Sequence, residues 1–187
     1  MKKVNVTSIY FKIITISMVL FFSSFKTLQD AVYPEQIDWD THFKAQPDEH
    51  SAFAAETATT WHYSYNATVR DNHLHIDFKF SAGVVPEKSW VKPDRISNRK
   101  VSRQLLNHEQ GHVYINFLLL KEGDIQIRNQ KYTPSNYKRL IQATANKVSD
   151  YYNRMQNRYD EETKHGSDLE AQSRWDDFIR SEMNKYQ

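Results

Sequence analysis

Two neighbouring stretches with a strict two-residue alternation constrain the fold of this chain more than any other feature. Apolar and polar residues alternate over residues 60–69 and again over residues 73–80. A half-buried β-strand has this period, because successive side chains point to opposite faces of the sheet. Asp71 and Asn72 separate the two stretches and tolerate positive φ, which suits a two-residue hairpin turn. The sequence therefore predicts a long antiparallel β-hairpin.

The rest of the β-like pattern predicts one more strand, and the polar face of the hairpin carries three histidines. Residues 82–91, AGVVPEKSWV, have strand character that Pro86 interrupts. His62, His73 and His75 alternate with the apolar positions of the hairpin, so we expect them to be exposed and not to bind a metal.

The pattern becomes helical from Ser97 onward. Apolar residues recur near helical spacing over residues 101–123. Gly123 is a natural C-terminal stop for this first helix. All the residues from Leu105 to Tyr114 are uncharged apart from one glutamate and two histidines, which indicates a buried helix.

Two further helices are expected. Thr133 and Pro134 predict the N-cap and the first turn of a helix that ends near His165 and Gly166, with the glycine as C-terminal cap. A serine at 167 and a glutamate at 170 form the S-x-x-E capping box of a last helix. The predicted class is α+β, with a small antiparallel β-sheet in the N-terminal half packed beside three α-helices in the C-terminal half.

The first 27 residues have the pattern of an export signal. Early lysines precede an uncharged apolar run over residues 13–25. That run is shorter than the roughly 20 apolar residues of a membrane span. We place the cleavage between Ser23 and Asp30, which leaves residues 30–187 as a single domain in the periplasm or outside the cell. The alternative is that the segment stays uncleaved as a membrane anchor.

Charge and cysteine content exclude several classes of function. The chain has 25 Lys and Arg, but four of these lysines belong to the predicted signal, which leaves 21 against 23 Asp and Glu. We therefore expect no nucleic-acid partner, and membrane contact only through the N-terminal segment. There is no cysteine, which excludes disulfides, thiolate metal sites and a cysteine nucleophile.

The candidate chemistry lies in His108-Glu109-Gln110-Gly111-His112, which matches H-E-x-x-H. Residues four apart share one face of a helix, so both imidazoles can bind one ion. Glu109 is offset along the helix and suits a general base acting on metal-bound water. Sites of this kind with an open position favour zinc, so we expect one Zn²⁺ per chain. The alternative is an ordinary polar patch on a surface helix.

A zinc-peptidase site needs a third protein ligand, and residues 159–166, YDEETKHG, contain three candidates. His165 lies at a helix end, where the side chain can point across the fold. Asp160 and Glu162 are rival ligands, and Asp160 also suits a partner that orients a ligand histidine. Tyr159 is a candidate for steadying the oxyanion of a tetrahedral intermediate. The alternatives are a histidine placed by the helix dipole, a solvated acidic turn and a core tyrosine.

Three stretches together resemble a bacterial family, domain of unknown function 922, regarded as secreted zinc metalloproteases. The first is IDWDTHFKAQPDEHSAFAAETATTWHYSY, the second is the HEQGH helix, and the third is YDEETKHG, which fits Y-D-x-x-T-x-H-G. The likeness extends from about Ile37 to Trp175.

The resemblance implies a zincin-like active-site helix in which zinc is held by His108, His112 and His165, with Glu109 catalytic. Asp160 is the alternative third ligand. The pattern positions expected to support the ligands or the transition state are Tyr159, Asp160 and Thr163. The leading hypothesis is an exported zinc metalloendopeptidase that acts on a protein or peptide. The alternative is a non-proteolytic zinc-binding protein of the cell envelope, either a structural zinc site or a binding module.

Overall fold

The predicted hairpin is formed, and its turn has the backbone conformation that its two central residues favour. The computed structural model describes residues 33–186, in which β2 (Thr59–Arg70) pairs antiparallel with β3 (His73–Val84). Asp71 and Asn72 have φ values of 48° and 61°, as a type I′ turn requires. The predicted export segment, residues 1–27, lies outside the described residues.

The observed order of elements confirms the α+β class. No helix within residues 33–186 is both long and apolar enough to cross a bilayer. Besides β2 and β3, the helices and strands are α1 (Trp39–His42), β1 (Ala55–Glu56), β4 (Trp90–Val91), α2 (Arg99–Arg128), α3 (Tyr137–Thr163) and α4 (Leu169–Met183).

The strand predicted over residues 82–91 is divided between two sheets. Its first residues extend β3, and its last two form β4, which pairs antiparallel with β1. Between them Pro86 begins a short 3-10 turn that ends at Lys88. Proline has no N–H to continue the β3 ladder, which explains the interruption. The described residues therefore contain two small sheets, and the expectation of a single sheet is wrong in this detail.

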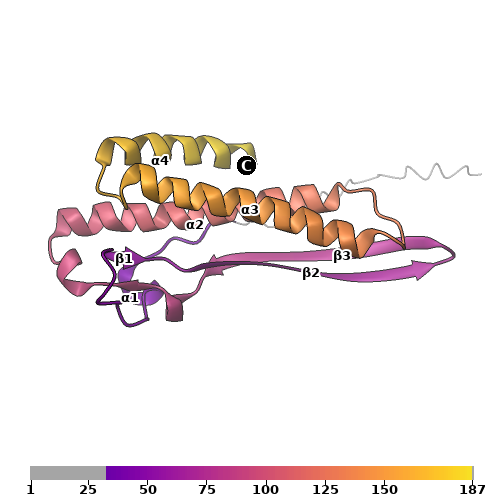
Figure 1. Ribbon diagram of the computed structural model, residues 1–187, viewed down its shortest axis with the longest axis horizontal. Helices are drawn as coiled ribbons and strands as arrows, with labels where there is room; N and C mark the ends of the chain where they lie inside the picture. The colour runs from indigo at the N-terminus through magenta and orange to yellow at the C-terminus, as the bar shows by residue number, and fades with distance from the viewer. Residues whose placement is uncertain (1–32, 187) are drawn as a thin grey trace, which may run out of the picture. The chain divides into compact units, whose positions relative to one another are not determined.

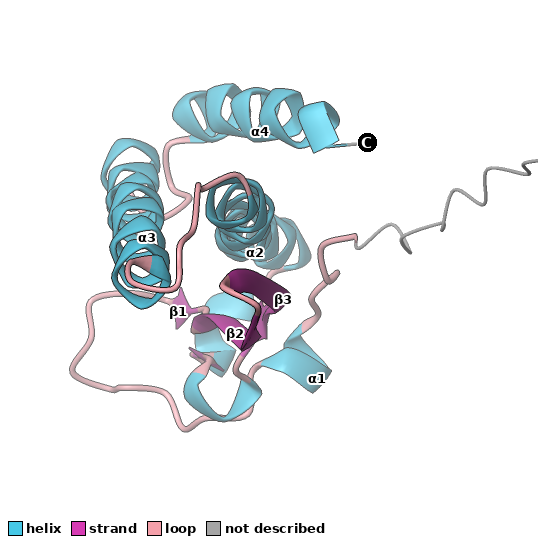
Figure 2. Ribbon diagram, turned by 90° about the vertical axis from the view of Figure 1, so that its right-hand side faces the viewer, coloured by secondary structure: helices cyan, strands magenta, loops and turns pink. Residues whose placement is uncertain are grey.

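Helix α2 is the central element, with the hairpin on one side and α3 and α4 on the other (Figures 1 and 2). Gly123 was expected to end this helix, but it lies inside it. A Cβ at Gly123 would lie 2.7 Å from Cζ2 of Trp61 in β2. The glycine therefore lets the helix pack closely against the hairpin, a role that depends on tertiary contact and not on helix termination.

The start of α3 also differs from the prediction. Asn136, and not Thr133, occupies the N-cap position. The Asn136 side chain accepts a hydrogen bond of 2.8 Å from the backbone N–H of Thr133. Thr133 and Pro134 therefore form the turn that precedes the helix, one turn earlier than the first helical residue.

The cap of α4 is shifted by one residue. The Asp168 carboxylate accepts a hydrogen bond of 3.0 Å from the Ala171 backbone N–H, which makes aspartate the N-cap. The Ser167 hydroxyl instead donates to the Lys164 carbonyl at 2.7 Å. The predicted S-x-x-E capping box is wrong, although the predicted helix is present.

Two groups of buried apolar side chains meet along α2. One packs α2 against α3 and α4 and consists of Ile115, Leu118, Leu119, Val148, Tyr152, Tyr159, Trp175 and Ile179. The other packs α2 against the residues that flank α1 and against β1. It consists of Ile37, Phe43, Ala55, Leu105 and Val113. The H-E-x-x-H segment lies between these two groups, so its backbone is held from both sides.

Candidate metal centre

The H-E-x-x-H segment lies three turns into α2 and is buried. Asn98 caps this helix by accepting hydrogen bonds from the N–H groups of Lys100 and Val101. The His108 residue is 1% exposed and Glu109 is 3% exposed. Polar groups this deeply buried require partners from other elements, because burial without them is costly. The partners come from the loop after β1, from α3 and from α4.

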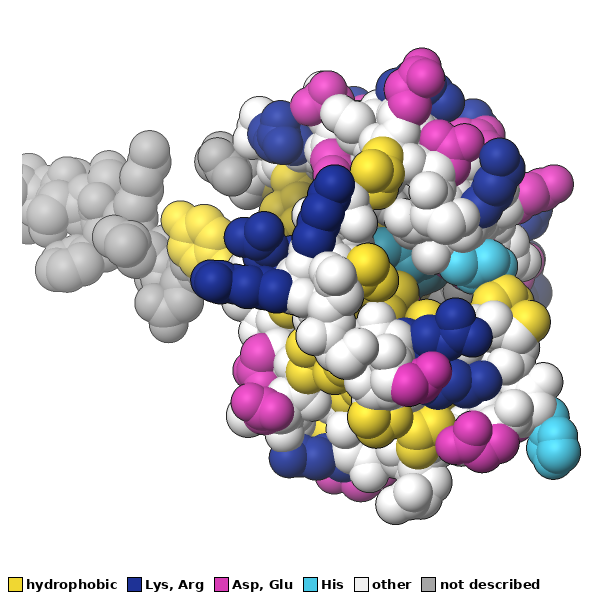
Figure 3. Space-filling model, turned by 90° about the vertical axis from the view of Figure 1, so that its left-hand side faces the viewer, with side chains coloured by type: hydrophobic (Ala, Val, Ile, Leu, Met, Phe, Trp, Pro, Cys, Tyr) yellow, Lys and Arg dark blue, Asp and Glu magenta, His cyan; other side chains and the backbone are white. Residues whose placement is uncertain are grey.

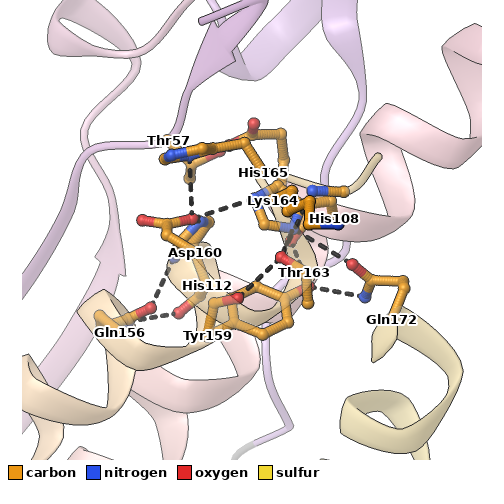
Figure 4. A network of polar contacts seen from close by, with 12 residues as sticks. Thr57, His108, His112, Gln156, Tyr159, Asp160, Thr163, Lys164, His165 and Gln172 are labelled. Atoms are coloured by element: carbon orange, nitrogen blue, oxygen red, sulfur yellow. Dashed lines mark hydrogen bonds and ion pairs between the residues drawn. The ribbon is translucent and has the colours of Figure 1, made fainter. Parts of the chain in front are cut away.

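One carboxylate oxygen is the common contact of three imidazoles (Figure 4). Oδ1 of Asp160 lies 3.1 Å from Nε2 of His108, 3.0 Å from Nε2 of His112 and 3.5 Å from Nδ1 of His165. Two ligands of a tetrahedral zinc ion with bonds of about 2.0–2.1 Å lie about 3.3 Å apart. Donor atoms of His108, Asp160 and His165 all lie within 4.8 Å of one another, and His112 joins them through its contact with Asp160. His108, Asp160 and His165 thus lie close enough together to hold one ion, and His112 lies beside them against the same Asp160 oxygen.

An unusual turn brings His165 to the cluster. Lys164, His165 and Gly166 all have positive φ, at 50°, 52° and 78°. Residues other than glycine rarely adopt a positive φ, so Lys164 and His165 in succession mark a strained turn. A Cβ at Gly166 would lie 2.7 Å from Cβ of His108, so glycine permits the turn to pass over this histidine. The His165 ring is 3.9 Å from the Phe53 ring, centroid to centroid.

Two glutamines orient the motif histidines. Nδ1 of His108 lies 3.2 Å from the amide oxygen of Gln172, and Nδ1 of His112 lies 2.6 Å from that of Gln156. The Gln156 amide also donates to the His112 carbonyl at 3.0 Å. When Nδ1 donates to an amide oxygen, Nε2 is the nitrogen left for a metal ion. Both histidines therefore direct Nε2 toward the same point.

Tyr159 and Thr163 support His108 from behind. The fully buried Tyr159 donates its hydroxyl to the His108 carbonyl at 2.9 Å and accepts from the Gln172 amide at 2.7 Å. A Cβ at Gly111 would overlap the Tyr159 hydroxyl, so this glycine makes the approach possible. The Thr163 hydroxyl donates to the Tyr159 carbonyl at 2.7 Å and lies 3.4 Å from Nδ1 of His108. Tyr159 and Thr163 therefore lie where they can hold His108 in place. The Tyr159 hydroxyl contacts the backbone of α2.

The carboxylate of Glu109 has a partner from the β-rich half of the chain. The Thr57 hydroxyl donates a hydrogen bond of 2.6 Å to Oε2 of Glu109. Thr57 directly follows β1, 52 residues before its partner. The glutamate is thus held beside the histidines and does not bond to them.

These groups line one cleft of about 380 Å³. Figure 3 shows histidine side chains inside a hollow on this side of the molecule. The volume is within the range of ligand-binding pockets, about 300–1,000 Å³. Besides the four-residue cluster and Glu109, the lining residues are Phe53, Ala55, Glu56, Thr57, Thr59, Asn116, Leu119, Tyr152, Asn153 and Gln156.

Two ionisable groups of the cluster, Asp160 and His112, have shifted pKa values. Burial alone would raise the pKa of the Asp160 carboxyl, but hydrogen bonds from His108 and His112 outweigh it and hold that pKa well below its usual range. Burial would lower the pKa of the His112 imidazole, yet the hydrogen bond to Asp160 and the charge of Glu109 raise it overall. The carboxylate of Asp160 and the imidazole of His112 therefore each favour the charged form of the other.

The structure brings together the candidate residues His108, Glu109, His112, Asp160 and His165 in one cleft. Glu162, the other rival ligand, lies elsewhere: it bonds to Arg158 at 2.6 Å and to the Trp175 indole at 2.8 Å. The helix places this carboxylate on the side that faces α4. The histidines at 62, 73 and 75 are exposed on the hairpin, which confirms the predicted exposure.

Three residues of the site were missed: Thr57, Gln156 and Gln172. The two glutamines lie 44 and 64 residues from their histidines and belong to no recognisable motif. Thr57 stands in the Ala54-Ala55-x-Thr57 stretch that carried part of the family likeness, but this pattern does not say what the hydroxyl contacts.

Fold and site together define an α+β protein with an H-E-x-x-H helix whose histidines meet an aspartate and a third histidine from the next helix and turn. The chain belongs to the family described as bacterial protein of unknown function, DUF922, whose model matches residues 33–166. This confirms the resemblance seen in the sequence. No curated protein and no solved structure matches the chain.

Proposed function

We propose that the protein is an exported zinc-dependent metalloendopeptidase. The observation that carries the proposal is the contact of one Asp160 oxygen with three imidazoles, at 3.0–3.5 Å, in the cleft that also contains Glu109. His108 and His112 would bind the metal ion through Nε2. The third protein ligand would be Asp160 or His165.

The side chains of the site fit zinc in their donor atoms and in the hydrogen bonds that orient them. The site offers imidazole nitrogens and a carboxylate oxygen, a donor set that suits zinc with an open position. Ligand histidines in such sites usually donate their other ring nitrogen to an oxygen, which fixes the ring. Gln172 and Gln156 supply these oxygens for His108 and His112. The oxygens that orient the two imidazole rings are therefore already in place in the fold.

The position of Glu109 suits a general base. A bound zinc ion would acidify a water molecule and polarise the peptide carbonyl. Glu109 accepts a proton from the attacking water and later donates it to the leaving amine, while the water oxygen bonds to the carbonyl carbon and the C–N bond breaks. Its burial excludes bulk water from this transfer, which strengthens electrostatic interactions in the cleft.

The proposed substrate is a protein or a peptide. The cleft combines apolar side chains, such as Phe53 and Leu119, with polar ones such as Asn153, as a peptide with both side-chain types and backbone amides requires. The proposed location, the periplasm or the exterior, is supported by the basic and apolar pattern of residues 1–27.

A structural zinc site is the second candidate, and one observation favours it. Asp160 lies at ligand-like distance from all three histidines, so four side chains of the chain are available to fill a tetrahedral shell. A shell closed in this way has no position for water. Glu109 discriminates between the candidates, because a structural site needs no base.

The test compares the full-length wild type with Glu109→Gln, both loaded with zinc, on a mixture of quenched-fluorescent peptides. We expect the wild type to cleave peptides and the variant to lose at least about 10²-fold in rate, the contribution of a general base, with its zinc content unchanged. A zinc-loaded wild type that cleaves none of the peptides would favour the structural site and overturn the proposal.

A further inference from the structure

We infer that Thr57 is a positioning residue that fixes the orientation of the Glu109 carboxylate. This inference rests on the proposed function, because it assigns Thr57 a role in the same reaction. The Thr57 hydroxyl reaches Glu109 from outside α2, and it is not among the four side chains placed to bind the metal ion.

The carboxylate needs such a partner for two reasons. Glu109 is 3% exposed, and a buried carboxylate without a donor is strongly destabilised. The last torsion of a glutamate is also broad, so the side chain alone does not set the plane of its two oxygens. The 2.6 Å hydrogen bond to Oε2 removes this freedom and leaves the second oxygen for the water and the leaving amine.

Thr57 is itself held by the surrounding backbone. On one side, Ala55 pairs with Val91 in the sheet formed by β1 and β4. On the other side, the Ala58 N–H donates to the Ser89 hydroxyl at 3.0 Å, and Ser89 is fully buried. The hydroxyl is therefore presented from a segment anchored on both sides, which is what a group that orients another requires.

The geometry separates the effect of Thr57 from metal binding. Its hydroxyl contacts the base, whereas the histidines are oriented by glutamines from α3 and α4. Removing the hydroxyl should leave zinc and substrate bound and should misplace the base. A displacement of about 1 Å in a reacting group lowers a rate by about 10²-fold. The loss should therefore appear in kcat, with KM nearly unchanged.

The experiment compares Thr57→Val, which keeps the shape without the hydroxyl, with Thr57→Ser, which keeps the hydroxyl. Thr68→Val makes the same change on the exposed face of β2 and is the matched control. On one cleaved peptide we expect Thr57→Val to lose about 10- to 100-fold in kcat. KM should stay within about twofold, with Thr57→Ser and Thr68→Val close to wild type.

A second readout does not depend on turnover. If acetohydroxamate binds at the proposed zinc ion, its hydroxyl proton would be accepted by the Glu109 carboxylate, so the dissociation constant of acetohydroxamate should rise about tenfold in Thr57→Val. Thr57→Val with wild-type kcat and wild-type acetohydroxamate affinity would overturn the inference. A lower thermal midpoint with both values unchanged would do so as well, because that is a purely structural role. A wild type that cleaves no peptide would instead overturn the proposed function, and the acetohydroxamate affinity would still test the position of the base.

Discussion

The two halves of α2 bury different chemistry within one continuous helix. The first half, taken here as Arg99–Asn116, buries polar side chains at His108, Glu109, Gln110 and Asn116 beside the apolar Leu105, Val113 and Ile115. The second half buries apolar ones at Leu118, Leu119, Leu120 and Ile127. Apolar burial stabilises a fold without specific partners, whereas each buried polar group needs one. Stability alone therefore does not explain which residues the first half of α2 buries.

The polar half also has a structural task, which limits how much of it belongs to the chemistry. The Gln110 side chain accepts from the Ile37 N–H at 2.9 Å and donates to the Glu35 carbonyl at 2.8 Å. The Asn116 amide donates to the Thr60 carbonyl at 2.9 Å. Gln110 therefore connects residues 35–37 to α2, and Asn116 connects the hairpin to α2. Of these four, His108 and Glu109 remain for the proposed metal centre.

The largest expected effect is the loss of a proposed ligand that faces the polar half from α3 or from the turn after it. Asp160→Ala should lower zinc affinity by more than the roughly 10- to 100-fold that follows loss of a supporting hydrogen bond. His165→Ala should have a smaller effect, because this side chain is 41% exposed and lies on a turn. Zinc competition titrations on both variants measure this, with the exposed His62→Ala as control. Zinc lost only in His165→Ala would assign the third ligand to that histidine.

The apolar half should show the opposite behaviour. Ile127 is fully buried, so Ile127→Ala should lower the free energy of unfolding by about 2–5 kcal/mol. Its zinc stoichiometry at low temperature should equal that of the wild type. Ile125→Ala, at a position 43% exposed on the same turn, is the matched control for urea unfolding. Loss of zinc from folded Ile127→Ala would show that the two halves are coupled.

Smaller effects should follow from the glutamines that orient the histidines. Gln156→Leu or Gln172→Leu should lower zinc affinity by about 10- to 100-fold, because the imidazole loses the oxygen that fixes its ring. Gln142→Leu, elsewhere on α3, should leave the affinity unchanged. The same titrations measure all three variants. Wild-type affinity in both site variants would mean that the ring orientation comes from packing alone.

The smallest effect is a pH dependence of the zinc-free protein. His112 has a raised pKa, so the stability it contributes is present below about pH 6.5 and is lost as the pH rises through the raised value. Asp160 has a lowered pKa, so its contribution is present above about pH 3.8 and is lost as the pH falls through the lowered value. Urea unfolding should show a larger loss of stability from pH 5.5 to 8.5 in the wild type than in Asp160→Asn. Equal losses would contradict the pairing of these two groups.

The sequence predicted features that depend on neighbouring residues and missed those that depend on packing. The hairpin turn is local to Asp71 and Asn72, and the H-E-x-x-H spacing is local to one face of α2. Gly123 was misassigned because its role depends on Trp61, which comes from a strand 62 residues earlier. The supporting glutamines were missed for the same reason, since their function depends on how α3 and α4 lie against α2.

Elemental analysis of zinc tests the central claim most directly. It would be made on the full-length wild type and on His108→Ala after equilibration with zinc and removal of the excess, with circular dichroism to show that both are folded. The structure predicts one zinc ion per wild-type chain and none in the variant, because His108 is the most deeply buried of the three histidines. A folded wild type that retains no zinc would contradict a metal centre at this site.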